Sequence, residues 1–95
     1  MPLMPLPPDS IDTFADRPHW TVANGHATFA PVPGGWRAVV RQLPRPSGAA
    51  RFHVAVLDRA GVTRFAMEAG TVDDAIRSAE RGVLARNALR LVPRL

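Results

Sequence analysis

The sequence predicts an α+β fold, in which an antiparallel sheet of four to five short strands packs against one C-terminal helix. Two observations lead to this prediction. Apolar and basic residues alternate with a period of two between Trp36 and Glu68, as expected of half-buried strands. After Gly70-Thr71-Val72-Asp73-Asp74 the period changes to that of an amphipathic helix.

The first two strands are expected on either side of Asn24-Gly25, a dipeptide that favours two-residue hairpin turns. It separates two short β-prone runs at residues 20–23 and 26–30. The second run ends at Pro31-Val32-Pro33-Gly34-Gly35, because proline cannot donate to a ladder and glycine permits a reversal of the chain. The sequence therefore predicts a hairpin followed by a break before residue 36.

Three longer strands are expected at residues 36–42, 51–57 and 62–68. Successive strand side chains point to opposite faces, so each run divides into a core-facing set and a solvent-facing set. The core-facing set contains Trp36, Ala38, Val40, Phe52, Val54, Val56, Phe65 and Met67. A shift of one residue would bury arginines instead. Antiparallel sheets commonly have one face packed on the core and one face exposed to solvent. The solvent-exposed face here should present Arg37, Arg41, Arg51, His53 and Arg64.

The connections between these strands differ in their predicted form. Residues 43–50 contain Pro44, Pro46 and Gly48, and we expect a longer loop there. The run Asp58-Arg59-Ala60-Gly61 is short enough for a hairpin with glycine in the left-handed position.

The helix is expected to begin after Thr71, whose hydroxyl can accept a hydrogen bond from the amide three residues on, with Asp74 placed to reach back. It should run from residue 72 to residue 89 or beyond. An apolar stripe that should lie across the sheet consists of Val72, Ala75, Ile76, Ala79 and Val83. Glycine within a helix costs about 1 kcal/mol relative to alanine, so Gly82 indicates a close approach of helix and sheet or, as the alternative, a simple bend of the helix.

The start of this helix also carries a family resemblance. The run Gly70-Thr71-Val72-Asp73-Asp74-Ala75-Ile76-Arg77-Ser78-Ala79 resembles the strand-to-helix junction of small HicB-type antitoxin domains. In those domains a glycine, a threonine cap and an acidic pair open a helix behind a short antiparallel sheet. The resemblance implies a compact sheet-plus-helix module. It carries no functional residue over, and the proline-containing sheet motif usual before that helix is not in its place here.

The length of 95 residues suits one domain, which we expect at residues 19–95, preceded by a flexible proline-rich arm at residues 1–18. Neither a secretory signal nor an apolar run long enough to cross a bilayer is visible, so a cytoplasmic protein without membrane contact is expected. The chain has no cysteine and cannot form disulfides. Because domains this small bury only about 60% of their surface, we expect that a homodimer covers more apolar area, although the sequence does not name its interface.

The charge distribution is regional. All twelve basic residues are arginine, and the net charge is +4. Residues 1–18 hold three aspartates against one arginine, a net charge of −2, which leaves +6 for residues 19–95. The absence of lysine is also what a GC-rich genome would produce. Whatever its origin, a positive field attracts nucleic acid, acidic proteins or anionic surfaces.

Two basic surfaces are candidate binding sites. The first is the solvent-facing strand set Arg37, Arg41, Arg51, His53 and Arg64, which could neutralise backbone phosphates. The alternative is an ordinary solvated sheet face, and the inward register of the aromatic residues weighs against a platform on which RNA bases stack. The second surface follows the helix and the tail, with Arg77, Arg81, Arg86, Arg90 and Arg94, although cations near a helix C-terminus are favourable in any protein.

No catalytic, metal or cofactor site is expected. The three histidines, His19, His26 and His53, lack the spacing of a structural zinc site. No serine among Ser10, Ser47 and Ser78 stands with a base and an orienting acid. The pair Asp73-Asp74 suits helix capping, and neither Gly34-Gly35 nor Gly61 has a phosphate-loop pattern.

Two function classes therefore remain. The first is a small basic protein that binds nucleic acid, or acts in regulation, through its arginine-rich sheet face. The second is a non-enzymatic protein-interaction module, an adaptor or antitoxin-like partner, favoured by the exposed sheet edges and the proline-rich arm. An acidic protein is the kind of partner that the arginines would suit.

Overall fold

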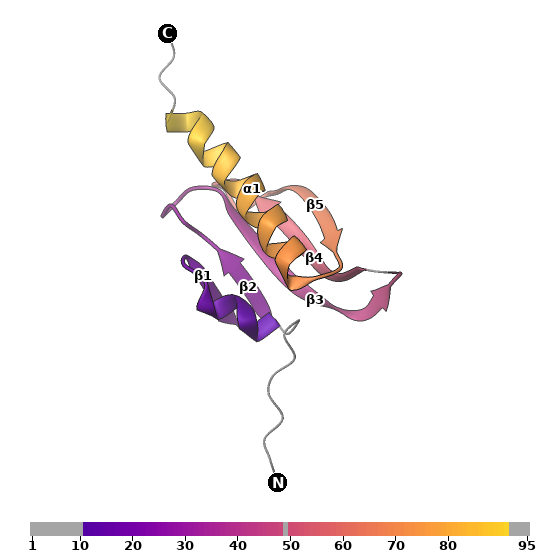
Figure 1. The fold of residues 1–95 in the computed structure, drawn as a ribbon. Coiled ribbons are helices and arrows are strands. Elements are labelled where there is room, and N and C mark those ends of the chain that lie inside the picture. Colours follow the sequence, from indigo (N-terminus) through magenta and orange to yellow (C-terminus); the bar gives the residue numbers. More distant parts are fainter. Residues whose placement is uncertain (1–10, 49, 92–95) are drawn as a thin grey trace.

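The computed structural model describes residues 11–48 and 50–91, and these form a single antiparallel sheet with one long helix (Figure 1). The strands are β1 (Trp20–Ala23), β2 (His26–Phe29), β3 (Arg37–Ser47), β4 (Ala50–Leu57) and β5 (Thr63–Ala69), and they neighbour one another in chain order. The helix α1 (Val72–Leu91) packs on one face, mainly over β3 and β4. The predicted α+β fold is therefore confirmed.

Two tight turns follow the predicted chemistry. Asn24 and Gly25 both have positive φ, 55° and 77°, and they join β1 to β2. A positive φ at both central residues is the requirement of the turn that Asn-Gly favours. Gly61, with φ of 84°, closes the turn between β4 and β5, where one carboxylate oxygen of Asp58 accepts hydrogen bonds from the amides of Ala60 and Val62.

The prediction of a longer loop at residues 43–50 is wrong. Strand β3 continues to Ser47 and β4 begins at Ala50, with Gly48 at the turn and a shift of register between Gln42 and Ser47. Proline fixes φ near the extended value and lacks an amide hydrogen. The two prolines therefore interrupt the ladder but keep the backbone extended.

Alternation decides which strand side chains enter the core. Alternate residues are buried on the side of α1 at Ala38 and Val40 in β3 and from Phe52 to Val56 in β4, and the largest fully enclosed side chains there are Val40, Phe52, Val54 and Val56. Trp36, Phe65 and Met67 pack against this cluster while remaining partly exposed. The predicted register of the three long strands is therefore confirmed.

The arm predicted at residues 1–18 needs correction in its second half. Residues Ile11–Asp16 form a short 3-10 helix, η1, which packs on β1, β2 and α1. The ring of Phe14 is fully buried, 5.1 Å from that of Trp20 and 5.8 Å from that of Phe52. The domain therefore begins earlier than residue 19, while the remainder of the predicted arm, residues 1–10, lies outside the described residues.

The helix begins and packs as its sequence predicts. The hydroxyl of Thr71 accepts a hydrogen bond from the amide of Asp74 at 3.0 Å. The buried stripe contains Ala75, Ile76, Ala79 and Val83. A Cβ atom on Gly82 would lie 3.3 Å from Val56 and 3.4 Å from Phe65, so the expected close approach to the sheet is confirmed.

Two side chains of α1 connect it to distant parts of the chain. Glu80 accepts a hydrogen bond of 2.9 Å from the indole of Trp20 and lies 3.5 Å from Arg17. Asn87, which is buried, accepts from the amide of Trp36 at 3.1 Å and donates to its carbonyl at 3.4 Å. These contacts connect α1 to β1 and to the residue that precedes β3.

Candidate nucleic-acid interface

The face of the sheet opposite α1 carries the predicted basic residues. Arg41, Arg51 and Arg64 are exposed, and Arg37 and His53 are partly exposed. Each is adjacent in sequence to a residue that packs in the core, so strand alternation turns it to the outer face. We call this surface, which contains Arg37, Arg41, Arg51, His53 and Arg64, the outer face.

The middle of the outer face is a row of cross-strand neighbours. His26 on β2 pairs with Arg41 on β3, Arg41 pairs with His53 on β4, and His53 pairs with Glu68 on β5. Directly opposed residues have Cβ atoms about 5 Å apart, so three basic side chains adjoin one another there. Glu68 limits the positive charge at the β5 end of the row.

Arg37 and Arg64 lie at the end of the sheet near the β4–β5 turn. A Cβ atom on Gly61 would be 3.1 Å from Nη2 of Arg37, which places that guanidinium beside the turn. Arg64 lies at a register shift of β5 and is 3.7 Å from Asp58, with 57% of its side chain exposed. An exposed pair at this distance contributes little to stability. Arg37 and Arg64 therefore form one group at this end of the sheet, separate from the group around Arg41 and His53.

An apolar strip separates the two groups. Val39 on β3, Ala55 and Leu57 on β4 are partly exposed in the centre of the outer face. They line a shallow hollow of about 270 Å³ together with His26, Arg41, His53 and Thr63. The outer face is therefore a basic rim around an apolar floor.

The β3–β4 hairpin extends beyond its neighbours. Within the described residues, β2 pairs with β3 no further than Arg41, and β5 pairs with β4 no further than Phe52. Beyond these points β3 and β4 run on as a two-stranded ribbon to Ser47 and Ala50 (Figure 1). Arg51 lies at the base of this ribbon.

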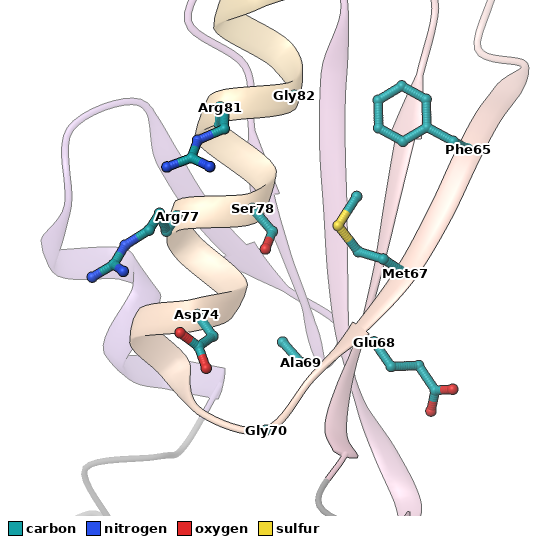
Figure 2. Close-up of a pocket in the computed structure, with 10 residues that line it drawn as sticks. All are labelled: Phe65, Met67, Glu68, Ala69, Gly70, Asp74, Arg77, Ser78, Arg81 and Gly82. Atoms are coloured by element: carbon teal, nitrogen blue, oxygen red, sulfur yellow. The ribbon is translucent and has the colours of Figure 1, made fainter.

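The second predicted basic surface is only partly free. Arg77 and Arg81 are exposed, and Figure 2 shows their side chains directed away from β5. The guanidinium carbon of Arg86 instead lies 5.6 Å from the ring centres of both Trp36 and Phe65, a cation–π arrangement. Arg94 and the side chain of Arg90 fall outside what the structure describes.

Sequence reasoning did not include His26 in the interface. Its ring nitrogen Nδ1 lies 3.0 Å from the carbonyl oxygen of Asn24, and its strand register sets it beside Arg41. The Asn-Gly turn fixes the register of β1 against β2, but it does not set the position of His26 relative to β3. The register of β2 against β3 depends on the connection at residues 30–36, which follows no simple turn rule.

Across residues 11–48 and 50–91 no group of three metal-ligating side chains converges, and none of the helical segments there could span a bilayer. Comparison with family models, curated proteins and solved structures gave no match to this chain. The outer face is therefore the feature of this chain that bears on function, and the HicB-type resemblance extends only to the order of sheet and helix.

Proposed function

We propose that this protein binds nucleic acid through the outer face, with duplex DNA as the preferred form. The observation that carries the proposal is the segregation of the two faces. The bulky aromatic residues of the long strands pack toward α1, whereas the five predicted basic residues lie on the opposite side of the sheet. Guanidinium groups on an open face can neutralise phosphates and release counterions.

The dimensions of the face favour a duplex. Arg37 and Arg41 are four residues apart on β3, which corresponds to about 14 Å at about 3.4 Å per residue. The major groove of B-DNA is about 12 Å wide, so two arginines at this spacing could contact phosphates on its two sides. Among the described outer-face residues of β3, β4 and β5 none is Phe, Trp or Tyr. Stacking of single-stranded bases therefore lacks a Phe, Trp or Tyr platform there.

The test is fluorescence anisotropy of labelled duplex DNA, single-stranded DNA and RNA, titrated at two salt concentrations. We expect duplex binding with little sequence preference that weakens steeply as salt rises, because phosphate contacts dominate the affinity. Arg41→Gln should weaken it, whereas Arg77→Gln on α1 removes the same charge and should not. Absence of binding at low salt, or equal loss in both variants, would contradict the proposal.

The apolar floor of the outer face favours a second candidate function, the docking of an acidic protein. Val39 and Leu57 would contact apolar side chains of that partner, and the surrounding arginines would contact its carboxylates. A nucleic-acid ligand should be indifferent to Val39→Thr, which keeps the shape and adds a hydroxyl. Binding of poly-glutamate together with no binding of DNA would favour this second function.

A further inference from the structure

The sheet ends in two unequal edges. The β1 edge has four residues, whereas the β5 edge has seven, from Thr63 to Ala69. An edge strand presents unpaired amide and carbonyl groups that can form a ladder with another strand. The β5 edge therefore offers the longer surface for association.

The inner side of β5 is only partly covered by α1. Phe65 and Met67 stay partly exposed, and both project from β5 toward the helix (Figure 2). They line a pocket of about 540 Å³ between β5 and α1, together with Ser78 and Gly82 among other residues. An element that extended the sheet past β5 would cover these two side chains from the open side.

The sequence of β5 suits antiparallel pairing with a second copy of itself. If a second β5 ran antiparallel with Ala66 at the two-fold axis, Arg64 would face the partner's Glu68, and Phe65 would face the partner's Met67. The same pairs recur on the other side of the axis, as a two-fold interface requires. Arg64 and Glu68 lie on the outer face and Phe65 and Met67 on the inner face, so each pair joins side chains of the same face.

We propose that two copies of this chain associate through β5 to form one continuous antiparallel sheet of ten strands. Opposite charges and an aromatic–methionine contact stabilise this register on both faces. The exposed Arg64–Asp58 pair at 3.7 Å is weak enough to exchange for the partner's Glu68. Within the described part of the chain, Glu68 forms no ion pair. The outer faces of the two copies would then lie on the same side of the joined sheet.

The first test reverses the charges. Light scattering after size exclusion of the full chain should give twice the mass of one chain. Arg64→Glu and Glu68→Arg should each raise the dimer dissociation constant by about tenfold or more, because each creates two like-charge pairs. The double variant carrying both changes restores the opposite-charge pairs and should restore the dimer. A wild-type monomer at high micromolar concentration, or a double variant as weak as the single ones, would overturn the proposal.

The second test uses the absence of cysteine from the chain. Ala66→Cys would place two thiols directly opposite each other, at a Cα separation of about 5 Å, which a disulfide accepts. Mild oxidation should give a crosslinked dimer in high yield. Ala23→Cys, an exposed alanine on β1, is the matched control and should crosslink poorly. Equal crosslinking in the two variants would overturn the proposed register, and it would do so whether or not the protein binds DNA.

Discussion

The two faces of the sheet are formed by the same strands, but they differ in burial and in the chemistry of their side chains. Val40, Phe52, Val54 and Val56 are fully enclosed under α1, and their neighbours in sequence form the basic rim and apolar floor of the outer face. The inner face therefore carries the stability of the domain, and substitutions there should change folding. The outer face makes few contacts that folding requires, so substitutions there should change binding.

The largest expected effect separates two adjacent residues of β3. Val40→Arg places a charge in a site with no exposure and should cost about 4 kcal/mol or more, enough to abolish a cooperative unfolding transition. Val39→Arg places the same side chain on the outer face and should change the free energy of unfolding by less than about 1 kcal/mol. Urea denaturation followed by circular dichroism measures both variants. Similar stabilities would contradict the division between the faces.

An intermediate effect is expected where α1 meets the start of β3. Asn87→Leu removes the hydrogen bonds of 3.1 and 3.4 Å to the backbone of Trp36. A buried backbone group left unsatisfied costs about 1 to 3 kcal/mol, so the unfolding free energy should fall by that amount. Ala85→Leu, an exposed change on the same helix, is the control and should have little effect. An unchanged midpoint for Asn87→Leu would mean that water replaces these bonds.

The smallest effect on stability distinguishes an arginine used in packing from one that is free. Arg86 lies 5.6 Å from the rings of Trp36 and Phe65, and Arg86→Gln should cost about 1 kcal/mol through the loss of both cation–π contacts. Arg41→Gln on the outer face should cost less than about 0.5 kcal/mol. The prediction fails if the two variants have equal unfolding midpoints.

Local rules predicted most of the fold. Strand alternation assigned Val40 and Phe52 to the core, Asn24-Gly25 gave a hairpin, and Thr71 caps the helix. Each of these outcomes depends on residues close together in sequence, where backbone sterics and local hydrogen bonds decide the structure. The sequence alone therefore sufficed for the fold class and for the outward placement of the basic residues.

Features that depend on contacts between distant residues were missed. Nothing local indicates that Phe14 would enter the core, because η1 is too short to show a hydrophobic period and its burial depends on Trp20 and Phe52. The hydrogen bond from the Trp36 amide to the side chain of Asn87 joins residues that are far apart in the chain. The apolar strip that divides the basic cluster emerges only when the register of β3 and β4 is known.

The proposed dimer would increase the difference in burial between the two faces of the sheet. Joining two sheets through β5 would leave both outer faces on one side and cover Phe65 and Met67 on the other. A duplex bound along the joined sheet would then meet twice as many arginines. The dimer and the binding function remain separable, because the crosslink at Ala66→Cys is measured without DNA.

The salt dependence of duplex binding tests the central claim most directly. For the wild type, the logarithm of the binding constant should fall linearly with the logarithm of salt concentration. The double variant Arg37→Gln/Arg41→Gln should reduce the magnitude of this slope by about 2 per bound chain, since each lost phosphate contact removes about 0.9. The control Arg77→Gln/Arg81→Gln should keep the wild-type slope. If the control loses as much slope as the outer-face variant, the protein attracts DNA by its net charge alone and the outer face is not the binding site.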